Sequence, residues 1–146
     1  MKRREFIQTT VATVPLLAGV PLGKAAQQRA TIETQIIRLQ LKHTWTTVMS
    51  SSDFRDTLHV RYIRDGLTGY GEGAPIVRYN ESAVTGQEAV GKVRSLLETA
   101  DPSAFAKLTD EVFHRIDGQY AAKAAMNIAL MDWTGKKLGV PRGSDD

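Results

Sequence analysis

The chain has 146 residues, of which 42% are hydrophobic and 24% charged, as in an ordinary globular protein. This length excludes a (β/α)₈ barrel, which needs roughly 200 to 250 residues, and leaves room for one domain of modest size. The chain contains no cysteine, which excludes a disulfide framework, a thiolate metal site and a cysteine nucleophile. Packing therefore has to stabilise the fold.

The formal net charge of +3 lies entirely in the first 26 residues. These residues contain four basic side chains and one acidic side chain, so the rest of the chain is net neutral. Nucleic acids and anionic membrane surfaces are bound through a local positive field. We therefore expect no nucleic-acid partner.

The first 26 residues have the three-part layout of a cleavable export signal: a basic start, an apolar stretch at Val11–Leu22 and small residues after it. The apolar stretch is shorter than the roughly 18 to 20 residues of a membrane span, so we expect no stable membrane anchor. Arg3 and Arg4, followed by Phe6, resemble a twin-arginine motif. The sequence predicts a twin-arginine-type signal peptide at 1–26 and a periplasmic or secreted location. An amphipathic first helix is the alternative.

The next segments predict a strand and a long loop. Thr31–Lys42 alternates with a period of two, which predicts a strand whose core face holds Ile37, Leu39 and Leu41. Ile32 and Ile36 lie on the other phase, so a bulge or two-sided burial is expected near Ile36. His43–Asp56 has no periodicity and is rich in Ser and Thr, which predicts a loop; loops of this length are usually functional or disordered.

Asp65-Gly66 separates two further alternating segments, which is a strong hairpin signal. The three strands are therefore expected to form an antiparallel meander. Gly69–Gly73 superficially resembles a phosphate-binding loop but opens no helix. We interpret its glycines as positions where the backbone passes close to another element. A second loop is expected at Ile76–Val84.

Three helical patterns follow, so the predicted fold class is α+β, a three-stranded antiparallel meander followed by three helices. A capping box at Thr85–Glu88 begins the first helix, and Asp101-Pro102 caps the second, which ends at Gly118. The third, about Tyr120–Leu138, is apolar nearly all round and must be buried on most sides. We expect it to expose a contiguous patch and to mediate self-association of the isolated chain, along Met126, Leu130 and Trp133 or their neighbours.

The sequence shows no acid–base pair, nucleophile or metal cluster. Asp132 lies inside the apolar third helix and could act as a general base, but a structural pairing with Lys136 or with backbone is favoured. The charged residues of the two loops are candidates for ligand contact, with solvated surface as the alternative; they are Asp53, Arg55, Asp56 and Arg78.

Several segments together resemble one protein family. Asp65-Gly66 followed by Gly69–Pro75 resembles the strand-to-loop passage of the capping domain in the mandelate racemase and muconate lactonizing branch of the enolase superfamily. Ala121–Pro141, with its Ala-Leu-x-Asp-x-x-Gly-Lys and Leu-Gly-x-Pro elements, resembles the last helix of that domain. Arg78–Ser82 leans toward the dipeptide epimerase subgroup. The resemblance covers about residues 31–141.

The resemblance implies an enolase N-terminal-domain-like capping domain at 27–141, followed by a polar tail at 142–146 where a barrel would begin. In that family the loops after the first and third strands close over the substrate. These loops correspond here to His43–Asp56 and Pro75–Ser82. The substrate-binding residues expected on them are Trp45, Thr47, Phe54, Arg55, Arg78 and Tyr79.

The family reaction abstracts a proton α to a carboxylate, with Mg²⁺ stabilising the enediolate and a lysine or histidine as base. The family's catalytic lysines and metal-binding carboxylates lie on barrel strands, and this chain has no matching positions. The resemblance therefore implies a truncated substrate-capping and specificity domain of an exported racemase or epimerase. It would bind a small carboxylate substrate only with a barrel present and be inactive alone, with no catalytic or metal-binding residue of its own. The alternative is a freestanding, non-catalytic exported binding module that uses the cap fold.

Overall fold

The computed structural model describes residues 28–140, so the predicted signal peptide and the polar tail lie outside the described residues. Three strands form one antiparallel sheet in the order β1-β2-β3: β1 (Thr31–Thr46), β2 (Ser51–Arg64) and β3 (Leu67–Gly73). Helical elements follow: η1 (Val77–Tyr79), α1 (Ala83–Thr99), η2 (Pro102–Ala104), α2 (Phe105–Arg115) and α3 (Tyr120–Leu138). The predicted meander followed by three helices is confirmed.

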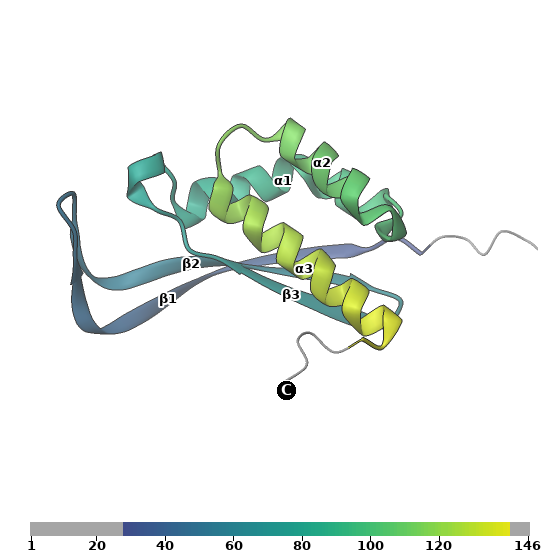
Figure 1. The fold of residues 1–146 in the computed structure, drawn as a ribbon, viewed down its shortest axis with the longest axis horizontal. Coiled ribbons are helices and arrows are strands. Elements are labelled where there is room, and N and C mark those ends of the chain that lie inside the picture. Colours follow the sequence, from purple (N-terminus) through teal and green to yellow (C-terminus); the bar gives the residue numbers. More distant parts are fainter. Residues whose placement is uncertain (1–27, 141–146) are drawn as a thin grey trace, which may run out of the picture.

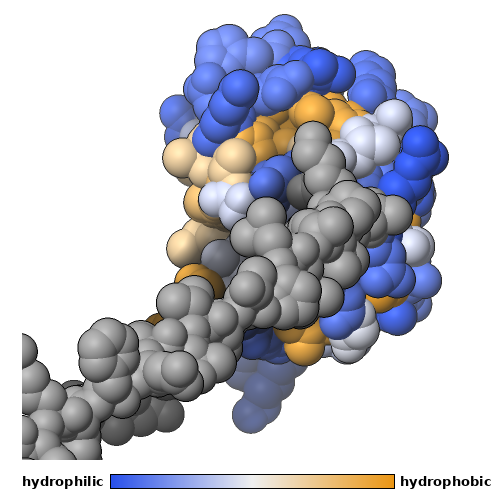
Figure 2. All heavy atoms as spheres, turned by 90° about the vertical axis from the view of Figure 1, so that its right-hand side faces the viewer, coloured by the Kyte–Doolittle hydropathy of each residue, from blue (hydrophilic) through white to orange (hydrophobic). Residues whose placement is uncertain are grey.

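The helices lie on one side of the sheet, and the far ends of β1 and β2 project beyond them (Figure 1). We call this projecting part, residues 38–56, the arm. The core lies between the sheet and the helices. Leu58, Val60 and Tyr62 of β2 are buried in a core cluster that also holds apolar side chains of α1, α2 and α3; β2 itself contacts α1 and α3. Figure 2 views the end of the molecule opposite the arm, where hydrophobic residues surface between hydrophilic ones.

The predicted core face of β1 is wrong. Ile32 is buried, and Thr34 on the same phase accepts a hydrogen bond from the Gln87 amide of α1, whereas Leu39 is 42% exposed. The helices cover only the first part of β1, and they do so on the Ile32 face. Pairing with β2 is unbroken through Ile36, and both Ile36 and Ile37 are half-buried, so two-sided burial occurs there without a bulge.

The predicted loop at His43–Asp56 is also wrong, because this segment is mostly extended and forms the end of a hairpin. β1 continues to Thr46 and β2 begins at Ser51, which leaves residues 47–50 as the turn. The pairing register shifts between Gln40 and Trp45, so four residues of β1 lie opposite a single residue of β2. This irregularity moves side chains to the other face and removes the period of two that the sequence pattern needed.

The hairpin turn and the helix caps lie at or near their predicted positions, but the residue that caps the first helix differs from the one predicted. Asp65 and Gly66 have φ values of 51° and 72°, the left-handed pair that a two-residue hairpin turn requires. The first helix begins earlier than predicted, because Ser82 is the N-cap and Thr85 is the third helical residue of its capping box. As predicted, Asp101 caps the next helical segment by accepting a hydrogen bond from the Ser103 N–H.

The third helix exposes a different face from the one predicted. Met126, Leu130 and Trp133 are buried, so their predicted exposure is wrong. The exposed apolar residues are their neighbours at helical spacing, which we call the α3 stripe: Ala124, Ile128, Met131 and Leu138. The Trp133 indole packs edge-to-face on Tyr62 and donates a hydrogen bond to the Arg64 carbonyl at 3.0 Å, which fixes the buried face toward the sheet.

Candidate functional site

The two segments predicted to close over a substrate lie together at one end of the molecule. The arm ends in the 47–50 turn, and the chain leaving β3 forms η1 at the same end (Figure 1). Between them is a cavity of about 220 Å³, which we call the hairpin hollow. Its lining comes from the arm and from the segment that contains η1: Trp45, Thr47, Val48, Met49, Ser50, Arg55, Ile76, Val77 and Arg78.

Four of the six predicted site residues line the hairpin hollow: Trp45, Thr47, Arg55 and Arg78. Phe54 and Tyr79 do not line it. The Phe54 ring lies 3.9 Å from the Arg38 guanidinium, and the Tyr79 ring packs edge-to-face on Tyr120 with centroids 5.5 Å apart. Both aromatic rings therefore contact side chains outside the lining of the hollow.

The sequence reasoning missed the apolar part of the lining. Val48, Met49, Ile76 and Val77 are all strongly exposed. Each lies in a segment that has no periodicity, so no face could be assigned to it from the sequence. These residues could have been predicted from the sequence, because large apolar residues in a polar turn cannot join the core and often mark a binding surface.

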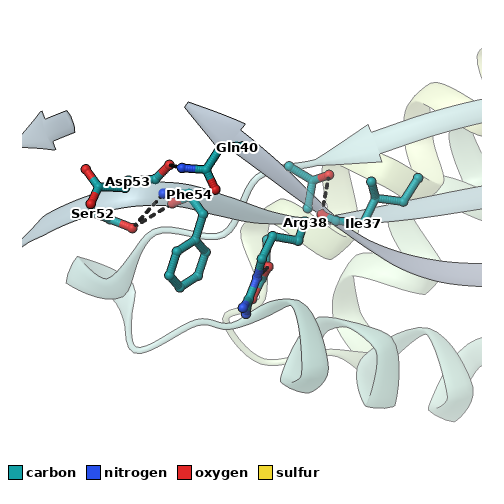
Figure 3. A network of polar contacts seen from close by, with 8 residues as sticks. Ile37, Arg38, Gln40, Ser52, Asp53 and Phe54 are labelled. Carbon is teal, nitrogen blue, oxygen red and sulfur yellow. Dashed lines mark hydrogen bonds and ion pairs between the residues drawn. The ribbon is translucent and has the colours of Figure 1, made fainter. Parts of the chain in front are cut away.

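A charge pair joins the two strands at the base of the arm. Arg38 donates two hydrogen bonds to the Asp56 carboxylate, each 2.8 Å long, from Nε and Nη2. The Arg38 guanidinium lowers the pKa of Asp56 below its ordinary value, mainly through this hydrogen bond, and Asp56 in turn raises the pKa of Arg38. The Arg38 and Phe54 side chains project to the same side of the strands (Figure 3).

The register shift in the arm is closed by side-chain hydrogen bonds around Asp53. The Gln40 amide donates to the Asp53 carbonyl at 2.8 Å, and the Thr44 hydroxyl donates to the Asp53 carboxylate (Figure 3 shows the first of these). The Ser52 hydroxyl donates to the Phe54 carbonyl at 2.6 Å. The Gln40 and Ser52 bonds give partners to backbone carbonyl groups next to the register shift, and the Thr44 bond joins two side chains across it.

The opposite wall of the hollow is anchored to α3 through Glu81. This carboxylate is buried and accepts hydrogen bonds from the backbone N–H groups of Tyr120 at 2.6 Å and Ala121 at 3.3 Å. An anion at a helix N-terminus satisfies free N–H groups and complements the helix dipole. Asn80, in the left-handed region at φ 56°, turns the chain from η1 into this anchor. The sequence reasoning did not single out Glu81.

The Gly69–Gly73 segment has the structural role that the sequence indicated. A Cβ on Gly69, Gly71 or Gly73 would lie 1.9–2.1 Å from a backbone carbonyl oxygen of α3. Only glycine lets the backbones of β3 and α3 approach this closely. The segment is therefore the packing surface for α3.

Asp132 is a structural residue, as favoured from the sequence. Its carboxylate accepts a hydrogen bond from the Tyr70 N–H and another from the Lys136 ammonium, both 2.8 Å long. Lys136 also donates to the Thr68 carbonyl at 2.7 Å. The two side chains thus bind the free edge of β3, which would otherwise present unpaired backbone groups.

A larger hollow of about 700 Å³ involves residues of all three strands and Ile128, but its charges are paired. Arg61 lies 3.1 Å from Glu33, and His59 lies 3.8 Å from Glu72. Within residues 28–140, no three His, Asp or Glu side chains come together in a way that could hold a metal ion. No helix in the same range is long and apolar enough to cross a membrane.

Comparisons with known proteins agree with the fold. The family described as "Mandelate racemase / muconate lactonizing enzyme, N-terminal domain" matches residues 31–142. The L-Ala-D/L-amino acid epimerase of Pedosphaera parvula is 37% identical over 108 residues, covering 70% of this chain and 30% of that protein. The chain therefore spans about a third of the length of the relatives it matches.

Two solved structures share the architecture. The substrate-liganded L-Ala-D/L-Glu epimerase from Bacillus subtilis has a TM-score of 0.70 at 23% identity, covering 76% of this chain and 32% of that one. The dipeptide epimerase from Methylococcus capsulatus, complexed with Mg and the dipeptide L-Arg-D-Lys, has a TM-score of 0.69 at 25% identity, with the same coverage. At 23% identity, the similarity to the Bacillus subtilis enzyme concerns the fold alone.

Proposed function

Because this chain belongs to the mandelate racemase/muconate lactonizing enzyme N-terminal domain family, we propose that it caps the substrate site of a dipeptide epimerase, with the arm and the η1 segment as its lid. The observation that carries the proposal is the hairpin hollow. Two segments about thirty residues apart in sequence enclose it, and it is lined by exposed apolar and basic side chains that the core does not use.

The small volume of the hollow supports the proposal that this chain provides only one part of the substrate-binding site. Pockets that bury a whole small ligand measure about 300 to 1,000 Å³, whereas this hollow measures about 220 Å³. It can take one end of a dipeptide while the rest lies against another part of the enzyme. The part of this chain in catalysis is to bind and orient the substrate and to exclude water.

The chemical step belongs to groups that residues 28–140 do not provide. Structures of relatives carry Mg together with a dipeptide, and no metal-binding cluster exists in the described range of this chain. We therefore assign no metal ligand and no base to these residues. Mg²⁺ would serve a complete enzyme of the family by stabilising the enediolate formed on loss of the α-proton.

We further propose that residues 1–26 direct export through the twin-arginine route. Their basic start with Arg3 and Arg4, short apolar stretch and small residues support this proposal. This route carries proteins that fold before export, which is compatible with the folded domain at residues 28–140.

The proposed function is tested by joining residues 31–141 to the barrel of the Pedosphaera parvula relative in place of its own cap. The fused protein should epimerise an L-Ala dipeptide, measured as deuterium incorporation at the α-carbon in D₂O, and a chelator should abolish the activity. The full chain alone should show no incorporation.

Circular dichroism and a cooperative melt would first establish that both parts of the fusion are folded. A folded but inactive fusion would reject the capping role and favour a freestanding binding module. Chelator-sensitive exchange by the chain alone would place chemistry in residues to which we assign none.

A further inference from the structure

Another hollow, of about 530 Å³, lies at the end of the molecule opposite the arm, where the β2–β3 turn meets the C-terminal end of α3 (Figure 1). Residues of η2 form a further wall. We call it the Arg64 hollow, after a side chain in its lining. Its volume lies in the range of about 300 to 1,000 Å³ that is typical of small-molecule sites. It shares no lining residue with the hairpin hollow, so it is separate from the proposed lid.

Arg64 is the one buried cationic residue within residues 28–140, with 6% of its surface exposed. A guanidinium has five N–H donors. Nη1 donates to the Ala100 carbonyl at 2.7 Å and lies 3.4 Å from the Tyr62 hydroxyl. In the same range Nε and Nη2 make no hydrogen bond, and neither is a fully buried polar atom. One edge of the guanidinium is therefore available to a ligand in the hollow.

The charge of Arg64 has no counter-ion in the described part of the chain. Two acidic residues line the hollow, but each binds another group. The Asp65 carboxylate accepts a hydrogen bond from the Lys137 ammonium at 2.9 Å, and the Asp101 carboxylate accepts one from the Ser103 N–H at 2.9 Å. Water solvates exposed lysines and arginines, whereas a buried cation is costly unless an anion pairs with it.

The structural role of Arg64 accounts for only part of this arrangement. Ala100 is the C-cap of α1, so its carbonyl offers the partial negative charge of a helix end, about half an elementary charge. That contact uses Nη1 alone. It leaves the remaining charge, and the donors on Nε and Nη2, to be matched from outside the described residues.

The other walls of the hollow are largely apolar. The Trp133 indole N–H is already bonded to the Arg64 carbonyl at 3.0 Å, so its ring offers only apolar surface. Leu138 also lines the hollow and is 69% exposed. A ligand that fits these walls has an apolar body beside its anionic group. The nearby carboxylates of Asp65 and Asp101 repel a doubly charged anion more than a singly charged one.

We propose that the Arg64 hollow binds a small monocarboxylate with an apolar body, whose carboxylate accepts hydrogen bonds from Arg64 Nε and Nη2. The apolar body lies against Trp133 and Leu138. The same pair of guanidinium nitrogens binds a carboxylate elsewhere in this chain, where Arg38 Nε and Nη2 each donate to Asp56 at 2.8 Å. The proposal does not depend on the proposed capping function.

The direct test is an NMR titration of the ¹⁵N-labelled full chain with 4-methylpentanoate, 4-methylpentanamide and inorganic phosphate. The carboxylate should shift the Arg64 Nε–Hε and Trp133 indole N–H signals. The amide has nearly the same shape without the charge and should bind at least about tenfold more weakly. Phosphate should leave both signals unshifted. Equal binding of acid and amide, equal shifts with phosphate, or no shifts at Arg64 and Trp133 would overturn the proposal.

Variants at the rim keep the test independent of core stability. Leu138→Asp places a negative charge beside the hollow and should weaken 4-methylpentanoate binding at least about tenfold. Met131→Asp adds the same charge to an exposed position of α3 outside the lining and should change the affinity less than about twofold. Equal effects of the two variants would reject the site.

Arg64→Gln removes the charge while it keeps an N–H donor for the Ala100 carbonyl. If this variant retains a cooperative melt, it should bind 4-methylpentanoate no better than 4-methylpentanamide. A folded Arg64→Gln chain that still prefers the acid would show that another group binds the carboxylate. If the variant unfolds, the Leu138→Asp and Met131→Asp comparison decides the question.

Discussion

At the scale of single residues, the glycines of β3 decide how closely the helical layer approaches the sheet. Gly71 has no room for a methyl group, because a Cβ there would lie 1.9 Å from the Ala125 carbonyl oxygen and 2.7 Å from the Ala129 nitrogen. Both atoms belong to the backbone of α3, so no side-chain rotation can relieve the overlap. The helix as a whole has to move.

We therefore predict that Gly71→Ala destabilises the chain by about 3 kcal/mol or more. Gly91→Ala is the matched control, because Gly91 lies on the exposed side of α1 with nothing within 4 Å of an added Cβ. The control should stabilise the chain by up to about 1 kcal/mol, since alanine favours helix. Urea unfolding of both variants measures the difference, and equal stabilities would contradict the packing described here.

The Arg38–Asp56 pair gives a second prediction at this scale. Since the folded pKa of Asp56 is lowered, its contribution to stability is present above the ordinary Asp pKa of about 3.9 and is lost as the pH falls through the lowered value. A ¹³C titration of the Asp56 carboxyl should have its midpoint below about 3.9. In Arg38→Gln the midpoint should rise toward that value; an unchanged midpoint would show that Arg38 is not the cause.

At the scale of elements, α3 has two apolar faces with different roles. One face, with Met126, Leu130 and Trp133, is buried against the sheet and the other helices. The other is the α3 stripe, whose residues are exposed in residues 28–140, Met131 and Leu138 more than Ile128. The helix is therefore apolar nearly all round because it has two apolar faces. The sequence alone could not show which of the two faces packs against the sheet.

Self-association through α3 stays a prediction, now assigned to the α3 stripe. Ile128→Lys with Met131→Lys should reduce binding of a hydrophobic dye and shift the sedimentation of the full chain toward monomer, while the melting temperature changes little. Leu130→Ala should instead cost about 2 to 5 kcal/mol, because it opens a cavity in the core. If the lysine variant unfolds the chain, the stripe is part of the core.

The elements also show where sequence reasoning succeeds and fails. The Asp65-Gly66 turn and the span Tyr120–Leu138 were predicted, because turn chemistry and helical composition are local properties. The core face of β1 and the extended arm were not. The face depends on where α1 packs, and the arm depends on a register shift closed by Gln40, Thr44 and Asp53, which are contacts between residues distant in sequence.

The candidate site was likewise predicted only in part. The charged and aromatic residues that line the hollow were among the predicted site residues: Trp45, Arg55 and Arg78. Phe54 does not line the hollow, because its ring lies against the Arg38 guanidinium, and its role in substrate binding stays a prediction. Glu81 was missed because its role depends on α3 beginning beside it in space.

At the scale of the whole molecule, the net charge of +3 lies in residues 1–26, the segment that we propose to be an export signal, and the rest of the chain is net neutral. Changing Arg3 and Arg4 together to lysine in a fusion of residues 1–26 to a reporter should abolish export. The unchanged fusion is the control. Continued export of the variant through the general secretory route would contradict the twin-arginine assignment.

The proposed function requires that the hairpin hollow contacts the substrate. The most direct measurement is kcat/KM of the active fusion carrying Trp45→Ala, compared with Phe113→Ala, an exposed aromatic residue on α2. Trp45→Ala should lower kcat/KM at least about tenfold, or about 1.4 kcal/mol of transition-state binding, with an unchanged melting temperature. Phe113→Ala should leave it within about twofold. Equal effects of the two variants, or full activity without the Trp45 ring, would contradict the lid assignment.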